Sequence, residues 1–342
     1  APCMKVDRGK VRPPEIGRYW INSHPLAFHQ LRGKVVLVDF WDYTCVNCVR
    51  TLPYVQEWWQ RYKEKGLVVI GIHTPEFTFA RYESNVERGV KEFGLTYPIV
   101  VDSDYELWKA FANRYWPTKY LIDKDGYLVY AHFGEGHYDE TEAAIQGLLR
   151  EIDPTIELPP LMAPVRDEDK PGAVCYQPTA ELYLGYRRGR IGNEGGFKED
   201  LVTQYHFDGD PEEGPFYATG AWASTAEYLG SEGEDCRVLL KYSAAGVNLV
   251  MAAKPDSAGD VEVLQDGKPL SDGQKTGDTV FREGRSFVHV DKARMYRLVD
   301  NHDFATHTLE LRFQAGIAAF AFTFTSCVEA RDPKGQAREV RS

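Results

Sequence analysis

The sequence predicts two domains of different class: an α/β domain followed by an all-β domain of the jelly-roll or sandwich type. At 342 residues the chain exceeds one average domain, and a hydrophobic content of 43% suffices for two buried cores. Helical periodicity ends at a Pro-rich, charged stretch, 153–172. We expect the first domain at 1–155, a linker at 156–174, the second domain at 175–330 and a polar tail at 331–342.

Apolar runs and amphipathic segments alternate in the first domain. Near-continuous apolar runs are typical of strands that helices cover on both faces, and they lie at 34–40, 67–73, 97–102, 119–123 and 127–133. Amphipathic segments predict helices from 45 to 65 and at 81–93, 104–116 and 139–152. The order of these segments is that of an α/β fold.

Short runs of alternating apolar and polar residues fill the second domain, spaced by about ten residues. The sequence "SAAG" at 243–246 predicts a tight turn between two of them, and "QDGK" at 265–268 predicts another. Spacing of this kind is typical of an antiparallel sandwich.

Charge and cysteine usage restrict the function. A net charge of −11 repels phosphate backbones and argues against nucleic-acid binding. Isolated cysteines that can pair at long range favour an oxidising compartment. The chain starts with Ala, so we expect a removed leader or anchor, or an excised part of a longer protein, and an extracytoplasmic location, periplasmic or in the cell envelope.

Cys45 and Cys48 form a Cys-x-x-C after the first apolar run. Zinc binding would need a second ligand pair at short spacing, which the sequence lacks. A structural disulfide would explain neither Asp39 nor Pro117. A redox dithiol explains both, with no cofactor beyond a Cys45–Cys48 disulfide. We expect the helix N-terminus to stabilise the thiolate of Cys45, and Cys48 to resolve the mixed disulfide.

Asp39 and Pro117 complete this prediction. Burial in the strand should raise the pKa of Asp39, so that it takes the proton from Cys48. Pro117 precedes a strand, and a cis Trp116–Pro117 bond would direct the backbone toward the dithiol.

Asp39, the dithiol, Pro53 in its helix and Pro117 together resemble the thioredoxin fold over residues 15–155, most specifically its TlpA-like branch. The stretches 41–55, 71–77, 115–123 and 132–138 are similar to the soluble part of DipZ-type proteins. In these proteins a β-sandwich resembling a carbohydrate-binding module follows the TlpA-like domain. The resemblance implies a thiol:disulfide oxidoreductase that acts on disulfide-bearing proteins, with a CcdA-type membrane protein as electron donor.

Four residues are expected to bind substrate: Trp41, Trp116, Thr118 and Glu76. The two tryptophans also fit ordinary core positions, and Glu76 lies where the TlpA-like branch often keeps an acid.

Cys236 and Cys327 stand at the start and end of β runs, which predicts a disulfide between them; two buried thiols are the alternative. The pairing of Cys3 and Cys175 stays open.

Neither Val46 nor Asn47 is cationic, and Asp39 disfavours negative charge, so we expect a reductant rather than a strong oxidant. Two other functions stay open. One is a glycan- or protein-binding role of the sandwich through aromatic side chains, namely Tyr183, Tyr186, Trp222 and Tyr228. The other is a thiol peroxidase.

Overall fold

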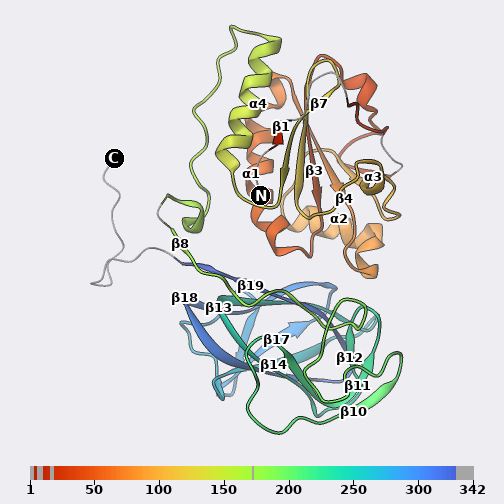
Figure 1. The fold of residues 1–342 in the computed structure, drawn as a ribbon, viewed down its shortest axis with the longest axis vertical. Helices are drawn as coiled ribbons and strands as arrows, with labels where there is room; N and C mark the ends of the chain where they lie inside the picture. Colours follow the sequence, from red (N-terminus) through yellow and green to blue (C-terminus); the bar gives the residue numbers. More distant parts are fainter. Residues whose placement is uncertain (1–3, 6–10, 16–18, 172, 329–342) are drawn as a thin grey trace, which may run out of the picture. The chain divides into compact units, whose positions relative to one another are not determined.

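The computed structural model describes residues 4–5, 11–15, 19–171 and 173–328. The chain divides into two compact units, Ala1–Val165 and Arg166–Ser342 (Figure 1). Within the described residues, no helix is both long and apolar enough to cross a membrane. Cys3 and the predicted tail at 331–342 lie outside the described residues.

The described part of the first unit contains a seven-stranded mixed sheet in the order β1-β7-β6-β3-β4-β5-β2. Strands β3, β4 and β5 are parallel, whereas β6 runs antiparallel to β3 and pairs with β7. Every residue of β3 is buried, as its continuous apolar run predicted. The strands are β1 (Met4–Lys5), β2 (Tyr19–Ile21), β3 (Val35–Trp41), β4 (Leu67–His73), β5 (Ile99–Val101), β6 (Thr118–Ile122) and β7 (Leu128–Phe133).

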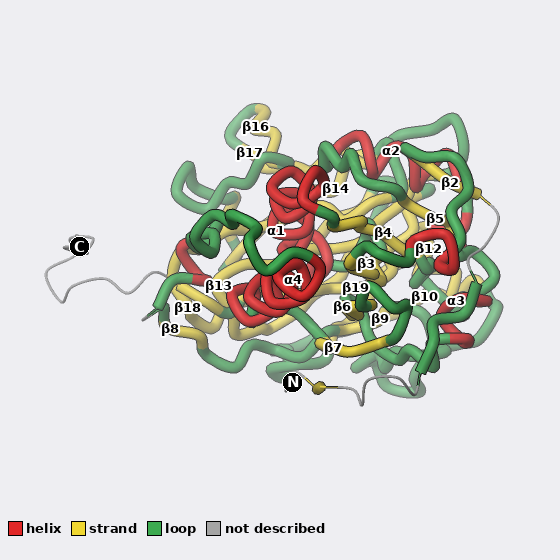
Figure 2. The backbone as a smooth tube through the Cα atoms, turned by 90° about the horizontal axis from the view of Figure 1, so that it is seen from above, coloured by secondary structure: helices red, strands yellow, loops and turns green. Residues whose placement is uncertain are grey.

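Helices cover both faces of this sheet, as Figures 1 and 2 show. Three helices pack on one face, around Leu37, Val69 and Leu121: α1 (Val46–Tyr62), α2 (Glu83–Glu92) and α4 (Tyr138–Ile152). The opposite face is covered by α3 (Glu106–Ala110) and η1 (Phe28–Leu31). Short 3-10 turns lie at η2 (Lys63–Lys65) and η3 (Thr78–Arg81). The predicted α/β architecture is confirmed.

The third helix is shorter than the predicted 104–116. Tyr105 and Ala112, on either side of it, adopt left-handed backbone angles, with φ of 60° and 52°, which a continuous helix excludes. The carboxylate of Asp102 accepts the N–H groups of Leu107 and Trp108 at 2.9 and 3.0 Å, and so acts as the N-terminal cap.

The predicted linker is bound to the first unit over its first ten residues, 156–165. Met162 N donates to Glu142 Oε2, and Val165 N donates to the Tyr54 hydroxyl, each at 2.8 Å. These contacts explain why the first compact unit extends to Val165. A 3-10 turn, η4 (Asp167–Asp169), follows.

The second unit is all-β, as predicted, but its strands form one continuous antiparallel sheet in the described residues. The order is β10-β11-β12-β19-β13-β18-β14-β17-β16, with β9 beside β19, β15 beside β14, and a further pairing of β11 with β13. A separate ladder joins β8 (Val174–Cys175) to β20 (Cys327–Val328). The sheet strands are β9 (Leu182–Tyr183), β10 (Val202–Tyr205), β11 (Phe216–Ser224), β12 (Leu229–Ser231), β13 (Cys236–Ala253), β14 (Gly259–Gln265), β15 (Lys268–Pro269), β16 (Thr279–Arg282), β17 (Arg285–Val290), β18 (Arg294–Phe313) and β19 (Ile317–Thr325).

The predicted turn at 243–246 is wrong, because β13 runs through it. Strand β13 shifts register against β18 between Ala244 and Gly246, and again between Val247 and Asn248. Such bulges let one long strand bend and join two neighbours in succession. Strand β11 pairs with the first part of β13, and β19 pairs with the last.

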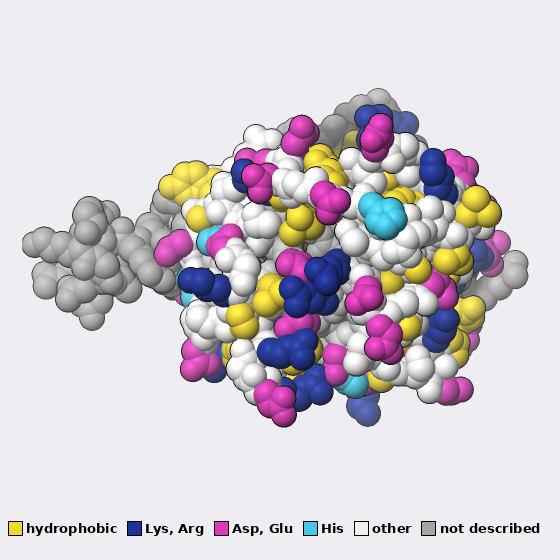
Figure 3. Space-filling view, turned by 90° about the horizontal axis from the view of Figure 1, so that it is seen from below, with side chains coloured by type: hydrophobic (Ala, Val, Ile, Leu, Met, Phe, Trp, Pro, Cys, Tyr) yellow, Lys and Arg dark blue, Asp and Glu magenta, His cyan; other side chains and the backbone are white. Residues whose placement is uncertain are grey.

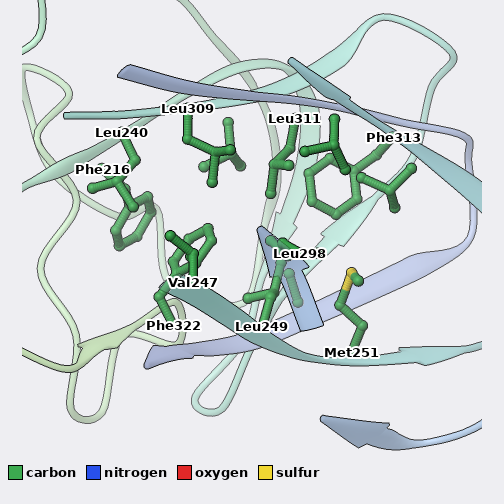
Figure 4. Close-up of a cluster of buried hydrophobic side chains, with 14 of the residues drawn as sticks. Phe216, Leu240, Val247, Leu249, Met251, Leu298, Leu309, Leu311, Phe313 and Phe322 are labelled. Carbon is green, nitrogen blue, oxygen red and sulfur yellow. The ribbon is translucent and has the colours of Figure 1, made fainter. Parts of the chain in front are cut away.

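An apolar core fills the inside of the second unit (Figure 4). Side chains of β11, β13, β18 and β19 point toward one another, among them Phe216, Leu249, Leu311 and Phe322. Trp222 is fully buried, and its ring meets that of Phe313 edge to face with centroids 5.1 Å apart.

The predicted disulfide between Cys236 and Cys327 is wrong. Cys236 is a free, buried thiol whose Sγ donates to Ala221 O at 3.0 Å. The two cysteines lie in different ladders. Cys236 of β13 lies opposite Phe313 of β18, whereas Cys327 lies opposite Cys175 in the β8–β20 ladder. Cys175 is itself disulfide-bonded.

Candidate active site

The two active-site cysteines lie at the junction of β3 and α1. Cys45 is the N-cap residue of α1 and is half-buried, whereas Cys48 lies in the first turn and is fully buried. Cys48 N donates to Cys45 Sγ at 3.4 Å, which is the contact expected for a sulfur at a helix N-terminus. Both thiols are free, so the structure shows the reduced dithiol.

Neither thiol is stabilised as a thiolate. The hydrogen bond from the Cys48 side chain lowers the pKa of Cys45, but burial and the charges of Glu76 and Asp42 raise it by more, so the net shift is upward. Burial, together with the hydrogen bond to Cys45, raises the pKa of Cys48 well above its usual value. The backbone N–H of Cys48 at the start of α1 lowers the pKa of Cys45, as predicted, but burial and the two carboxylates outweigh this effect.

Asp39 lies on the face of β3 that α1, α2 and α4 cover, and its charge acts on Cys48. Burial raises the pKa of Asp39 to about 7, and the ammonium group of Lys119 pulls it the other way. Lys119 is fully buried and stands directly opposite Asp39 in the β3–β6 ladder. Among the described residues, neither carboxylate oxygen of Asp39 has a hydrogen-bond partner. A carboxyl group in this setting changes its protonation state near neutral pH.

The segment before β6 has the predicted cis bond between Trp116 and Pro117. Trp116 is half-buried; its Nε1 donates to Thr74 O at 2.9 Å. The side chains of Thr118 and Trp41 are fully buried, so neither side chain is accessible to a substrate, and Trp41 occupies the core position that was its alternative. Thr118 Oγ1 instead donates to Tyr115 O at 2.8 Å.

The side chain of Asp42 connects the Cys45 loop to the end of β4 and to the loop that follows it. Its Oδ1 lies 3.2 Å from His73 Nε2, and both side chains are fully buried. Its Oδ2 accepts the N–H of Glu76 at 3.0 Å and the hydroxyl of Thr44 at 2.8 Å. The rings of Trp41 and Tyr43 enclose His73, with centroids 4.9 and 5.7 Å away. In the described residues, no cluster of three or more His, Cys, Asp or Glu could hold a metal ion.

Comparisons with known proteins match both units. The Redoxin family matches residues 22–149, and the family described as "Thioredoxin like C-terminal domain" matches 179–325. The thiol-disulfide oxidoreductase ResA of Bacillus anthracis is 33% identical over 134 residues, which cover 39% of this chain and 72% of ResA. The chain belongs to the thioredoxin-like thiol:disulfide oxidoreductases.

A longer match extends over both units of this oxidoreductase. Protein DipZ of Mycobacterium bovis is 36% identical over 310 residues, 89% of this chain. The chain spans 41% of the length of that relative. Among solved structures, a putative thioredoxin from Neisseria meningitidis is 26% identical and covers 42% of this chain and 92% of its own, with a TM-score of 0.38. The predicted resemblance to DipZ-type proteins is confirmed.

Sequence reasoning gave no role to three residues of this oxidoreductase that act on the site, Asp42, Tyr97 and Lys119, and it treated His73 as an ordinary core or solvated histidine. The charges of Asp39 and Cys48 act on the hydroxyl of Tyr97, and burial raises the pKa of that hydroxyl well above its usual value. Gly71 leaves room for the Tyr97 ring, since a Cβ there would lie 3.0 Å from it. The sequence could have indicated Asp42, because a carboxylate three residues before a reactive cysteine disfavours the thiolate form of that cysteine.

Proposed function

We propose that this chain reduces disulfide bonds of proteins outside the cytoplasm, with Cys45 as the attacking thiol and Cys48 as the resolving thiol. The single observation that supports this best is Asp39. It is a buried carboxyl group with a pKa of about 7, and it is coupled to a thiol whose pKa is raised well above the usual value. Such a thiol needs a nearby base before it can attack.

The reaction takes two steps. The thiolate of Cys45 attacks one sulfur of the substrate disulfide; the S–S bond breaks, and the departing sulfur takes up a proton. Asp39 then accepts the proton of Cys48, whose thiolate attacks Cys45 Sγ and releases the second substrate thiol. The substrate gains two electrons, and the enzyme ends as the Cys45–Cys48 disulfide.

The raised pKa of Cys45 supports the reductive direction. A strong oxidant holds its reduced form as a stabilised thiolate, but here burial and two carboxylates act against that thiolate. The same shift disfavours a thiol peroxidase, because the thiolate is the reacting species.

The proposed location rests on Cys175, which is disulfide-bonded. Structural disulfides persist mainly in oxidising compartments. The oxidised dithiol has to be reduced again there, and we assign this step to a CcdA-type membrane partner, as the family resemblance implies.

Reduction of insulin by the full chain tests the proposal. Cys45→Ser should reduce activity to background, and Cys48→Ser should accumulate a mixed disulfide at Cys45 that is visible on a non-reducing gel. Cys236→Ser is the matched control, because this thiol is buried in the second unit. Full activity of Cys45→Ser would contradict the proposal.

A second candidate function is glycan binding by the second unit. Of the four aromatic side chains predicted for this role, Trp222 is a core residue, and the guanidinium of Arg188 lies over the ring of Tyr183, 3.6 Å from its centroid. A groove of about 540 Å³ offers another place; it is lined by Phe287 and by charged side chains, and the guanidinium groups of Arg282 and Arg285 lie 4.6 and 4.9 Å from the centroid of the Phe287 ring. Figure 3 shows basic and acidic side chains interspersed on one face of the molecule.

Titration of the full chain with defined oligosaccharides tests this second function. Binding that Phe287→Ala abolishes would support it, with Tyr228→Ala as the control outside the groove. No heat of binding for any oligosaccharide, or binding that Phe287→Ala leaves intact, would contradict it.

A further inference from the structure

Two buried hydrogen-bond donors lie beside Asp39 on the same face of the sheet. Gly71 of β4 stands directly opposite Asp39 in the parallel β3–β4 ladder. A Cβ on Gly71 would lie 3.0 Å from the Tyr97 ring and 3.2 Å from Trp41 Nε1, so both side chains use the space that Gly71 leaves open. The Tyr97 hydroxyl and the Trp41 N–H are fully buried, and neither has a hydrogen-bond partner among the described residues.

The neighbouring acceptor is also unpaired. Neither carboxylate oxygen of Asp39 accepts a hydrogen bond from the part of the chain that the structure describes. Buried polar groups without partners are rare, because each has lost its bonds to water. A carboxyl group is a weak acceptor while it is protonated and a strong one once it is ionised. An unpaired donor beside it therefore fits a site whose charge changes during a reaction.

Of the two donors, Tyr97 interacts with the charges of the site. The charges of Asp39 and Cys48 both act on its hydroxyl, and its ring packs in the same apolar cluster as Cys48. Burial raises the pKa of the hydroxyl well above its usual value. Tyr97 therefore keeps its proton and can act as a donor.

We propose that Tyr97 is a positioning residue of this oxidoreductase, whose hydroxyl donates a hydrogen bond to the carboxylate of Asp39 once that group is ionised. The bond holds Asp39 in the form that accepts the proton of Cys48. Tyr97 keeps its own proton throughout: the proton of Cys48 passes to Asp39, and the negative charge passes from the carboxylate to the Cys48 sulfur. Because the two groups are not bonded in the structure, the hydroxyl has to shift toward the carboxylate when Asp39 ionises.

Other groups on this face also act on Asp39 or lie near it. Lys119 of β6 stands directly opposite, and its positive charge favours the carboxylate. Helix α1 contributes the thiol of Cys48, and the buried residues of α2 are apolar. On α4, the carboxylate of Glu142 accepts the hydroxyl of Tyr62 at 2.6 Å. A variant that removes only the Tyr97 hydroxyl leaves all of these groups in place.

The test is the titration of Asp39 in the reduced full chain. It is followed by the carboxyl carbon signal in NMR spectra of protein labelled at aspartate, and the signal is assigned with Asp39→Asn. The wild type should titrate near pH 7. Tyr97→Phe should move the midpoint upward by about one pH unit, a tenfold change in the ionisation equilibrium, because a hydrogen bond to the charged form is lost. An unchanged midpoint, or a shift to lower pH, would overturn the inference.

Tyr62→Phe is the matched control. Tyr62 is also fully buried on this face, but its hydroxyl donates to Glu142 Oε1 at 2.6 Å and accepts from Gln146 Nε2 at 2.8 Å. Its loss should lower the stability in denaturant unfolding and leave the titration of Asp39 unchanged. Tyr97→Phe should not lower the stability at pH 5, because it breaks no hydrogen bond there. A similar shift of the midpoint in both variants would contradict the assignment.

The resolving step gives a second readout, which rests on the proposed role of Asp39 as the base. Release of a thiol from its mixed disulfide with Cys45 should be about tenfold slower in Tyr97→Phe at pH 6 and close to the wild-type rate at pH 9, where Asp39 is ionised in both proteins. Equal slowing at both pH values would indicate structural damage and overturn the inference. The NMR titration needs no substrate. A shifted midpoint in a chain that does not reduce insulin would therefore support the hydrogen bond and contradict only the proposed function.

Discussion

The two units bury their polar groups in opposite ways. Around the dithiol, Asp39, His73 Nδ1 and the Tyr97 hydroxyl are buried without a hydrogen-bond partner among the described residues. In the second unit, every buried polar side chain that the structure describes has one. Glu262, for example, accepts two hydrogen bonds from Arg285, each at 2.7 Å.

This difference indicates that the first unit carries destabilising buried groups at its reactive site, whereas the second unit does not in its described part. A buried polar group without a partner is destabilising, and such groups are found mostly at reactive sites. The second unit has no such groups in its described part and is held together by apolar packing. The following variants test this contrast, from the largest expected effect to the smallest.

Trp222→Ala should destabilise the second unit by about 3–5 kcal/mol, because it leaves a large cavity against Phe313. Hydrogen exchange of the β13 amides measures the loss. Alkylation of Cys45 by iodoacetamide should not change, and a parallel change there would show that the two units are energetically coupled.

The stability of the first unit should fall as the pH rises from about 4 to 7. Asp39 has a folded pKa of about 7, against about 4 when unfolded, so the folded state binds the extra proton in this window. The shift corresponds to about 4 kcal/mol, which is fully lost above pH 7. Exchange of the β3 amides should show this slope in the wild type and lack it in Asp39→Asn.

The loss of stability caused by Glu262→Gln should be larger at neutral than at acidic pH, because the stabilisation by Glu262 has the opposite pH dependence to that of Asp39. Two hydrogen bonds from Arg285 lower the pKa of Glu262, so its stabilisation is present above the unfolded pKa and is lost as the pH falls through the folded value. Because Arg285 is 55% exposed, we expect a modest loss of about 1–2 kcal/mol at pH 7. Denaturant unfolding at pH 7 and pH 3 measures it, and an equal loss at both values would contradict this account.

Cys236→Ala should cost only about 1 kcal/mol, the value of one small buried side chain and one weak hydrogen bond. A lost disulfide would cost about 2–5 kcal/mol instead. Labelling of unfolded, unreduced protein checks the same point, since Cys236 should react with a thiol reagent.

The sequence was sufficient where local pattern determines structure. Continuous apolar runs located β3 and β4, and the spacing of Asp39, Cys45 and Pro117 located the dithiol site. Prediction from the sequence failed where the pairing of distant strands determines the structure. The turn at 243–246 is absent because β18 pairs with β13 on both sides of the bulge, while β11 pairs before it and β19 after it.

The same limit applies to the site. His73 and Lys119 lie far from Cys45 in sequence, and only the pairing of β4 and β6 with β3 brings His73 to Asp42 and Lys119 to Asp39. The pKa of Cys45 was misjudged because the helix was counted and the charges of Asp42 and Glu76 were not. A local pattern cannot show which charges the fold assembles.

The most direct test of the central claim is the pH dependence of the resolving step. A mixed disulfide of Cys45 with a chromogenic thiol releases that thiol when Cys48 attacks, and the release is followed by absorbance. If Asp39 is the base, the rate rises through an inflection near pH 7 in the wild type, and Asp39→Asn lacks the inflection and is about a hundredfold slower. The same inflection and rate in both proteins would contradict the account.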